Sequence, residues 1–365
     1  MYLKRALQLA WKGRYETAPN PMVGAVVVRD GRVVGEGFHG RAGGPHAEVV
    51  TLEAAGELAR GATVHVTLEP CAHHGRTPPC TDALIAAGVS KVVACHPDPD
   101  ARVAGGGFRK LAAAGIEVAW GPLAEEAMRL NLRYLVPKVL GRPQVTLKWA
   151  MSLDGRVATA RGESQWISGD RARRWALDLR ELHDAILVGS GTVLADDPRL
   201  NRRLGHAGGE IVRVVLDRRL RVPPDARLFA QPGTVLLYTE SASPRSQARA
   251  LAASGAEIVE QERVTAATVL ADLHGRGIGS VLVEGGPTVA ALFGATGLYD
   301  RVCAVCAPLL IGGATAPGPL AGIGVEALAA APRLEGLTTR RRGDDLILEG
   351  LRSGCLRELS SSWAG

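Results

Sequence analysis

Four residues that could hold and use a metal ion occur in order in the first part of the chain. His46 and Glu48 lie in the segment PHAE, Cys71 follows in the segment EPC, and Cys80 comes next. One imidazole and two thiolates supply three zinc ligands and leave a fourth tetrahedral position for water, which is typical of a catalytic zinc site. Zinc lowers the pKa of that water toward neutrality. The sequence therefore predicts one Zn²⁺ per chain, held by His46, Cys71 and Cys80.

Glu48 is the candidate for proton transfer at this site. In the first turn of a helix that points end-on at the metal, Glu48 and His46 both converge on the ion, and the positive helix terminus stabilises negative charge there. We expect Glu48 to take a proton from water and deliver it to a ring nitrogen and to the leaving ammonia. His-x-Glu followed by Pro-Cys is the zinc-deaminase signature. Each residue alone is more often a helix cap or a small core residue, but the ordered set of four favours the metal site.

The elements that position these residues follow an α/β order. Apolar runs at 22–28, 63–68 and 91–95 predict buried strands, and 46–60 and 81–87 predict helices that end at glycines. This β-α-β-α-β order favours a sheet covered by helices on both faces.

Glycine and two prolines at 137–143 mark a boundary, which gives domains 1–141 and 142–365. Further strands are predicted in the second domain at 144–150, 185–188, 211–216, 234–238, 280–283 and 301–307, with helical patterns between several of them. The tail from Leu356 onward is predicted to fray. A sheet of this size provides a cofactor cleft at the strand ends.

Composition narrows the class of protein. The 365 residues are 46% hydrophobic and 22% charged, as in a globular protein with a substantial core. Six cysteines in a chain of this length do not form a disulfide scaffold, and the start of the chain has no apolar run suited to a signal peptide or membrane span, so we expect a cytoplasmic protein. The net charge of +6 suits an anionic small molecule, and with 4% aromatic residues it argues against nucleic acid as a partner.

The loop between the two cysteines is longer than the Pro-Cys-x-x-Cys of simple nucleoside deaminases, and its basic groups suit a substrate with a phosphate. With the flanking TLEPC and CTDAL, and with PNPMVG near the start, it resembles the deaminase half of the bifunctional riboflavin-biosynthesis deaminase/reductase. That resemblance implies a cytidine-deaminase-like α/β/α domain in which Asn20 holds the pyrimidine and Arg76 the ribose phosphate. The family usually has Ser at the position of Ala72 and Asn at the position of Asp100.

Four segments of the second half, LKWAMSLDG, GESQWIS, GSGTVLADDP and VEGGPT, resemble the reductase half of the same family. The last is a strand that leads through a glycine turn into a helix, where free backbone amides can bind phosphate. The second half contains no GxGxxG segment, so an ordinary Rossmann domain is not supported there. The resemblance implies a C-terminal dihydrofolate-reductase-like α/β domain that uses NADPH.

By this resemblance, two sets of residues bind the ligands of the reductase. The NADPH contacts are Ala150, Trp166, Thr192, Asp196, Gly286, Pro287, Thr288, Val289, Ala290, Ala291 and Leu292. The substrate contacts are Ser164, Arg180, Leu200, Arg203 and Glu284, with the catalytic candidate Lys148 nearby. Arg180 and Arg203 suit a phosphate clamp, and Lys148 or Glu284 could supply the acid. Two alternatives stay open when each residue is taken alone: Trp166 could fill a core, and Asp196 could cap a helix or turn.

The favoured function is zinc-dependent deamination of 2,5-diamino-6-ribosylamino-4(3H)-pyrimidinone 5′-phosphate, followed by NADPH-dependent reduction of its ribosyl group. One alternative is a nucleic-acid-directed zinc deaminase with a non-catalytic second domain, and another is a non-catalytic zinc protein that binds a nucleotide. The family resemblance also implies a homo-oligomer. We expect neither nucleic acid nor membrane as a partner.

Overall fold

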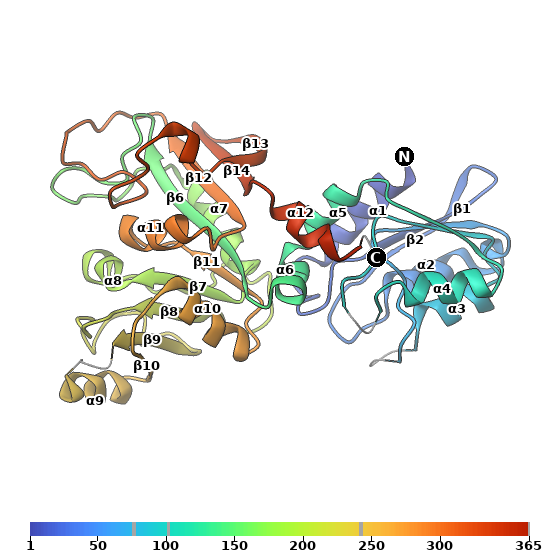
Figure 1. The fold of residues 1–365 in the computed structure, drawn as a ribbon, viewed down its shortest axis with the longest axis horizontal. Helices are drawn as coiled ribbons and strands as arrows, with labels where there is room; N and C mark the ends of the chain where they lie inside the picture. The colour runs from blue at the N-terminus through green and yellow to red at the C-terminus, as the bar shows by residue number, and fades with distance from the viewer. Residues whose placement is uncertain (75–77, 101–102, 241–243, 364–365) are drawn as a thin grey trace. The chain divides into compact units, whose positions relative to one another are not determined.

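The structure, a computed structural model, describes residues 1–74, 78–100, 103–240 and 244–363 (Figure 1). The chain divides into two compact units, Met1–Gly141 with Leu356–Gly365, and Arg142–Cys355. The sequence predicts that the second domain extends to residue 365, but the end of the chain packs with the first unit instead. The reason is apolar burial: Leu356 and Leu359 are buried, and the Trp363 ring stacks on His96 at 4.8 Å.

The first unit contains a five-stranded sheet in the order β2-β1-β3-β4-β5. β1 is antiparallel to both β2 and β3, whereas β3, β4 and β5 are parallel. The strands are β1 (Gly24–Arg29), β2 (Arg32–Phe38), β3 (Thr63–Val66), β4 (Lys91–Ala94) and β5 (Glu117–Trp120). The helices are α1 (Tyr2–Ala10), α2 (Ala47–Ala55), α3 (Cys80–Ala86), α4 (Gly106–Ala113), α5 (Ala124–Leu130), α6 (Leu132–Leu140) and α12 (Cys355–Ser360).

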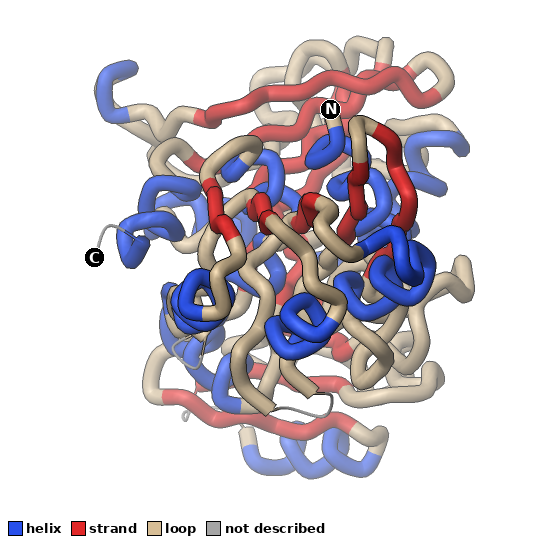
Figure 2. The backbone as a smooth tube through the Cα atoms, turned by 90° about the vertical axis from the view of Figure 1, so that its right-hand side faces the viewer, coloured by secondary structure: helices blue, strands red, loops and turns tan. Residues whose placement is uncertain are grey.

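Alternating side chains of the central strands bury both faces of this sheet. Val26 and Val28 of β1 pack with the α1 residues Ala6 and Leu9. The intervening residues of β1 and those of β3 pack on the other side in a cluster that includes residues of α2 and α3. Because successive side chains of a strand point to opposite faces, helices cover both sides of the sheet. Figure 2 shows this arrangement of helices around the strands.

The second unit is built on a nine-stranded sheet in the order β10-β9-β8-β7-β11-β6-β12-β14-β13 (Figure 1). The strands from β10 to β12 are parallel, and β14 and β13 add an antiparallel hairpin. The strands are β6 (Gln144–Ser152), β7 (Ala185–Gly189), β8 (Val212–Leu216), β9 (Val235–Glu240), β10 (Ala256–Gln261), β11 (Ser280–Val283), β12 (Arg301–Ala307), β13 (Leu334–Arg342) and β14 (Asp345–Arg352). The helices are α7 (Asp170–Glu181), α8 (Ser190–Asp196), α9 (Arg245–Ala253), α10 (Ala266–Gly275) and α11 (Pro287–Thr296).

Helices also cover both faces of this second sheet. One core cluster joins Leu187 of β7 and Val283 of β11 to residues of α10 and α11. A second cluster joins Ile186 and Val188 to residues of α8 and α9 on the opposite face. Both units therefore have the predicted α/β architecture, and the residues that follow the parallel strands come together at the carboxyl edge of each sheet.

Each strand predicted from an apolar run is present within a few residues of its expected bounds. Five strands were not predicted: β2, β5, β10, β13 and β14. The tail predicted to fray forms helix α12 instead. Among the described residues, no helix is both long and apolar enough to cross a membrane.

Candidate functional site

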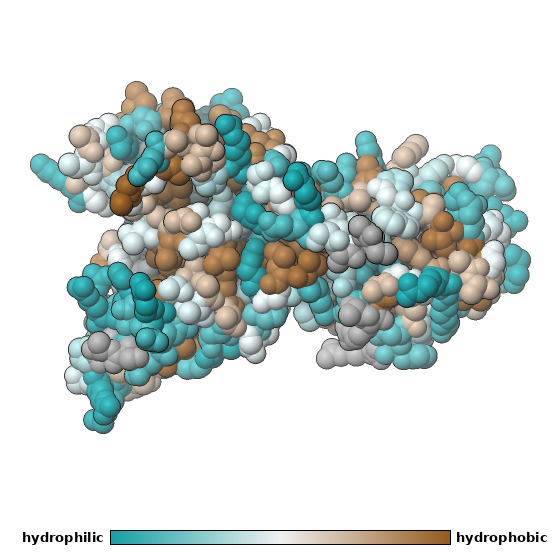
Figure 3. Space-filling model, viewed as in Figure 1, coloured by the Kyte–Doolittle hydropathy of each residue, from teal (hydrophilic) through white to brown (hydrophobic). Residues whose placement is uncertain are grey.

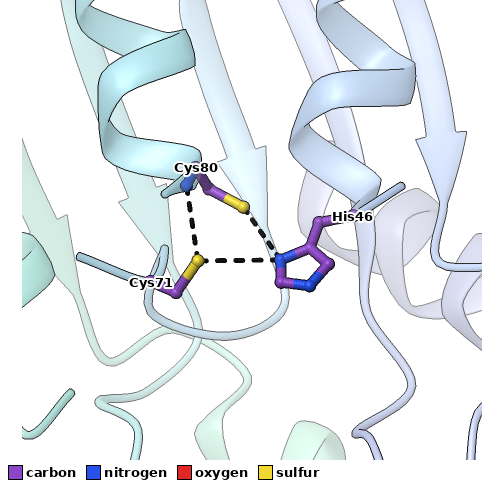
Figure 4. Close-up of side chains that lie close together, drawn as sticks. All are labelled: His46, Cys71 and Cys80. Atoms are coloured by element: carbon purple, nitrogen blue, oxygen red, sulfur yellow. Dashed lines mark hydrogen bonds between the residues drawn. The ribbon is translucent and has the colours of Figure 1, made fainter. Parts of the chain in front are cut away.

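The side chains of His46, Cys71 and Cys80 converge at the ends of two helices of the first unit (Figure 4). His46 is the residue that precedes α2, and Cys80 is the first residue of α3. Cys71 follows β3 in the segment EPC. The Nδ1 atom of His46 lies 3.1 Å from the Cys80 Sγ and 3.6 Å from the Cys71 Sγ. The structure thus brings together the three predicted metal ligands.

This geometry fits a zinc ion. All three ligand atoms lie within 4.8 Å of one another. Ideal tetrahedral zinc with bonds of about 2.0 Å to nitrogen and about 2.3 Å to sulfur places ligand atoms about 3.6 Å apart. The 3.6 Å between the His46 Nδ1 and the Cys71 Sγ matches that value, and the 3.1 Å to the Cys80 Sγ is shorter. Three protein ligands leave one coordination position open for water. His46 would bind through Nδ1, because this nitrogen faces both sulfur atoms.

Local electrostatics favour negative charge on one of the two sulfur atoms, that of Cys71. Hydrogen bonding from Cys80 holds the pKa of Cys71 well below its usual value, and the backbone N–H of Cys80 also donates to the Cys71 Sγ, at 3.3 Å. The hydrogen bond to Cys71 raises the pKa of His46. The pKa of Cys80 is raised, first by the Cys71 sulfur and then by burial. Without metal, the two sulfur atoms therefore share one negative charge. A zinc ion bound between them would stabilise a second negative charge, so that both cysteines become thiolates.

Glu48 lies in the first turn of α2 and is only 3% exposed. Burial raises the pKa of Glu48 to about 7, and the nearby Cys71 thiolate adds to the increase. Its carboxyl group also interacts with Cys80 and His46. Glu48 therefore faces the three ligands, as expected for a group that exchanges protons with a molecule bound among them.

His39 connects the predicted pyrimidine contact Asn20 to this centre. The Nδ1 atom of His39 lies 3.0 Å from the carbonyl oxygen of Pro45 and must donate to it. Its Nε2 atom is therefore an acceptor, and it lies 3.2 Å from the Nδ2 of Asn20. The rings of His39 and His46 meet edge to face at 5.3 Å. No role is predicted for His39 from the sequence, although its position in the segment that leads into PHAE was a usable signal.

Glu69, two residues before Cys71, was also overlooked. Its buried carboxylate accepts four backbone N–H groups at 2.9–3.2 Å: those of Asp98 and Gly105 in the loop after β4, and those of Gly107 and Phe108 in the first turn of α4. Glu69 thus joins the metal-ligand segment to that loop. A carboxylate directly before Pro-Cys, followed later by three glycines, was the only sequence signal for this role.

Two positions depart from the family pattern, and one predicted contact cannot be placed. Asp100 is 7% exposed and pairs with Lys138 of α6 at 2.9 Å, so the extra negative charge has a partner. Ala72 lies beside Gly106 at the start of α4. Arg76 lies outside the described residues, so its contact with the ribose phosphate stays a prediction.

In the second unit, Glu284 and Arg180 form a buried ion pair. The Nη2 and Nε atoms of Arg180 lie 2.6 and 3.1 Å from the Oε2 of Glu284. Burial opposes ionisation of Glu284, but the charges of Arg180 and Lys148 outweigh it and hold its pKa below the usual value. The strand register explains why Lys148 lies beside Glu284, because Leu147 of β6 pairs with Val283 of β11. Within the described residues, the Oε1 of Glu284 has no hydrogen-bond partner and is left for a ligand.

The other predicted substrate contacts lie on loops. Burial lowers the pKa of Arg203, and so does the charge of Arg180, because the two guanidinium groups lie near each other. Leu200 has a φ of 48° and is 2% exposed, and it packs in the core cluster with Ile186 and Val188. Ser164 is partly buried, and no hydrogen bond links it to this cluster within the described residues.

The predicted cofactor residues gather around the glycine turn after β11. The N–H of Gly286 donates to the Oγ1 of Thr192 at 3.1 Å. A Cβ on Gly285 would lie 2.5 Å from the Cα of Val188, so only glycine allows this close approach of strand and turn. The residues from Pro287 to Leu292 form the first turns of α11. This arrangement presents a helix N-terminus beside Thr192, which suits an anionic cofactor.

The other three cofactor candidates do not belong to the glycine turn or to its contact with Thr192. Trp166 is 68% exposed, so it does not fill a core, and the Arg173 guanidinium lies 4.6 Å from its ring. Asp196 accepts a hydrogen bond from the side chain of Gln165 at 3.0 Å, which ties the Trp166 segment to α8. Ala150 is partly buried on β6, against Val305 of β12.

Comparisons with known proteins agree with this division into two sites. Residues 1–96 match the family model of the cytidine and deoxycytidylate deaminase zinc-binding region, and residues 143–348 match that of the RibD C-terminal domain. The riboflavin biosynthesis protein RibD of Escherichia coli is 44% identical and covers 95% of this chain and 97% of its own. The chain belongs to the RibD family.

Relatives extend over nearly the whole chain. RibD of Aquifex aeolicus is 40% identical, and the alignment covers 95% of this chain and 96% of the relative. The structure of RibD from Acinetobacter baumannii has a TM-score of 0.83 at 40% identity, covering 96% of this chain and 98% of that one. The deaminase/reductase of Thermotoga maritima has a TM-score of 0.82 at 36% identity, covering 96% and 97%.

These findings confirm the predicted family and fold class. The chain joins a cytidine-deaminase-like domain to a RibD reductase domain and is a bifunctional enzyme of riboflavin biosynthesis. The alternative of a nucleic-acid-directed deaminase with a non-catalytic second domain is not favoured, because the similarity to RibD proteins includes the whole reductase domain.

Proposed function

We propose that residues 1–141 deaminate 2,5-diamino-6-ribosylamino-4(3H)-pyrimidinone 5′-phosphate, and that the domain predicted from residue 142 onward reduces the ribosyl group of the product. The end product would be 5-amino-6-ribitylaminouracil 5′-phosphate. The observation that carries the proposal is the convergence of His46, Cys71, Cys80 and the buried Glu48 on one point. The similarity to RibD proteins over the whole chain supports the second step.

In the deamination, His46, Cys71 and Cys80 would hold one zinc ion, which when bound activates water for attack on the amine-bearing ring carbon. Glu48 would take a proton from that water and pass protons to the ring nitrogen and to the departing amine, which leaves as ammonia. Asn20, oriented by its contact with His39, would hold the pyrimidine. Arg76 would bind the phosphate.

In the reduction, the residues around the Gly286 turn would hold NADPH, which when bound would supply a hydride for C1′ of the ring-opened imine. The adjacent nitrogen then needs one proton to complete the amine. Glu284 is a poor donor, because the charges of Arg180 and Lys148 favour its ionised form. We therefore assign the proton to Lys148, which lies beside Glu284 on the neighbouring strand. Arg180 and Arg203 would hold the substrate phosphate.

Glu48→Gln tests the first step. The amide keeps the size of the side chain but cannot accept the proton, so ammonia release should fall about 10²- to 10⁴-fold. Zinc content, measured by atomic emission, and NADPH oxidation with deaminated substrate should both stay at wild-type values. Ammonia release at the wild-type rate would show that Glu48 is not the proton carrier.

Lys148→Ala is the matched variant for the second unit. It should remove NADPH oxidation and leave ammonia release intact. Loss of both activities in either single variant would point to a damaged fold rather than to two separate sites.

Self-association into a homo-oligomer and a cytoplasmic location also belong to this proposal. β13, an edge strand, is exposed along its whole length and carries Leu334 and Leu337. The preceding loops expose Ile323 and Leu328, and hydrophobic side chains reach the surface among the loops at the upper left of Figure 3. Edge strands and apolar patches of this kind are typical of subunit interfaces. A solution mass equal to one chain of 38.3 kDa would contradict the oligomer.

A further inference from the structure

The loop after α8, residues 198–210, carries Leu200 and Arg203 and is fastened to the end of α7 by one buried carboxylate. Glu181, the last residue of α7, is 0% exposed. Its Oε1 accepts the N–H groups of Arg203 and Leu204 at 3.2 and 3.0 Å, and its Oε2 accepts that of Ala207 at 3.0 Å. Although burial opposes ionisation, these bonds hold the pKa of Glu181 below its usual value.

Arg202 anchors the same loop as a hydrogen-bond donor, whereas Glu181 is an acceptor. Its guanidinium donates to the carbonyl oxygens of Arg180 at 3.3 Å and His183 at 2.7 Å, at the end of α7. It also donates to those of Gly208 and Gly209, both at 3.1 Å, at the far end of the loop. Glu181 therefore accepts hydrogen bonds from N–H groups of the loop, whereas Arg202 donates to carbonyl groups of both the loop and the helix end.

Such an anchor is needed because the loop brings like charges together. The pKa of Arg203 is lowered by burial and then by the charges of Arg180, Arg199 and Arg227, with Glu284 acting in the opposite direction. Repulsion between these guanidinium groups pushes the loop away from α7 when no anion is bound. Asn201 lies between the two central arginines: its side-chain oxygen accepts from Arg203 at 3.0 Å, and its carbonyl oxygen accepts from Arg180 at 3.4 Å.

We propose that Glu181 is a positioning residue for the reductase substrate. It sets the separation of the Arg180 and Arg203 guanidinium groups so that both can bind the phosphate monoester. Arg180 precedes it on α7 and turns toward Glu284, whereas the carboxylate of Glu181 turns into the loop. The helix end thus fixes one phosphate ligand directly and the other through the backbone of the loop. This inference rests on the proposed role of Arg180 and Arg203.

Glu181→Gln is the test. The amide can accept from Arg203 and Leu204, but its NH₂ group then faces the N–H of Ala207, so one end of the anchor becomes repulsive. We expect KM for the deaminated substrate to rise about tenfold, with kcat largely kept, because phosphate binding contributes equally to the ground and transition states. The inhibition constant of ribose 5-phosphate should rise by the same factor. The dissociation constant of NADPH and the rate of ammonia release should not change.

Glu210→Gln is the matched control, since Glu210 is an exposed carboxylate at the end of the same loop. It should leave both KM and the inhibition constant unchanged. Arg202→Gln, which releases the loop from the other side, should reproduce the effect of Glu181→Gln.

Two results would overturn the inference. One is an unchanged inhibition constant for ribose 5-phosphate in Glu181→Gln. The other is an equal loss of NADPH affinity, because it would show that Glu181 supports the whole unit rather than the phosphate site. Arg203→Ala separates this inference from the proposed function. If Arg203→Ala leaves the inhibition constant unchanged, the phosphate site itself is wrong; if only Glu181→Gln has no effect, the positioning role alone is wrong.

Discussion

Acidification should destabilise the first unit through one buried histidine. His96 follows β4 and is 0% exposed. Its Nδ1 lies 2.8 Å from the carbonyl oxygen of Pro97, and within the described residues its Nε2 has no hydrogen-bond partner. The ring stacks on the indole of Trp363 at 4.8 Å with an interplanar angle of 8°. Burial lowers the pKa of His96 to about 4, from 6.5 for the exposed residue.

The size and sign of the effect follow from these two pKa values. Below pH 6.5 the unfolded chain binds a proton at His96 that the folded state does not, so the free energy of unfolding falls as the pH falls. The loss continues down to about pH 4 and reaches about 3 kcal/mol, at 1.36 kcal/mol per pKa unit. At pH 5 the same two values give a loss of about 2 kcal/mol. Above pH 7 this histidine contributes no pH dependence.

His96→Phe keeps the stacked ring but removes the titrating nitrogen. Hydrogen exchange of the β3 and β4 amides in wild type and variant, at pH 7.5 and pH 5, gives the free energy of unfolding of the first unit. We expect the wild-type value to fall by about 2 kcal/mol more than that of the variant, because other titrating groups contribute equally to both. Trp363→Ala should shrink this difference, since exposure of His96 returns its pKa toward 6.5. Equal losses in wild type and His96→Phe would refute the reasoning.

Two further predictions concern the metal centre. Glu69→Gln replaces an acceptor of four N–H groups with a side chain that has a donor at one end, so the first unit should lose about 3 kcal/mol of stability and bind zinc more weakly. Unfolding and zinc-competition titrations measure this, and wild-type zinc affinity would contradict the link to the ligand segment. Removal of zinc by a chelator should stop ammonia release, leave NADPH oxidation intact and make the partly exposed Cys71 reactive toward a thiol reagent. Continued ammonia release from metal-free protein would rule out the zinc-dependent mechanism.

The sequence was most informative where the residue types themselves carry the chemistry. His46, Glu48, Cys71 and Cys80 are recognisable because zinc chemistry accepts few ligand types, and they stand in a fixed order at strand–helix junctions. Glu69 and Glu181 were not recognised, because each acts by accepting backbone N–H groups from a segment distant in the sequence. Every residue type except proline carries the same backbone N–H group, so the sequence does not indicate which N–H groups a carboxylate will bind. Such contacts can be identified only in the folded structure.

The missed strands have equally physical causes. β2 contains Gly35 and Gly37, which weaken any strand pattern. In the structure, a Cβ at either position would lie within about 2.6 Å of an atom of Thr51, so close packing of α2 requires both glycines. β13 ends in Arg340, Arg341 and Arg342 and has no buried face, so it shows no alternation of apolar and polar residues. Only its pairing with β14 makes it a strand.

The return of residues 356–363 to the first unit makes the second unit an insertion within the first. A gene fragment that stops after Gly141 would therefore omit part of the domain it is meant to encode, and would leave the surface covered by Leu359 and Trp363 bare. In the intact polypeptide, both ends of the inserted domain are covalently tied to the same neighbour. Cleavage of the backbone at only one of these two connections would therefore leave the two units covalently joined through the other.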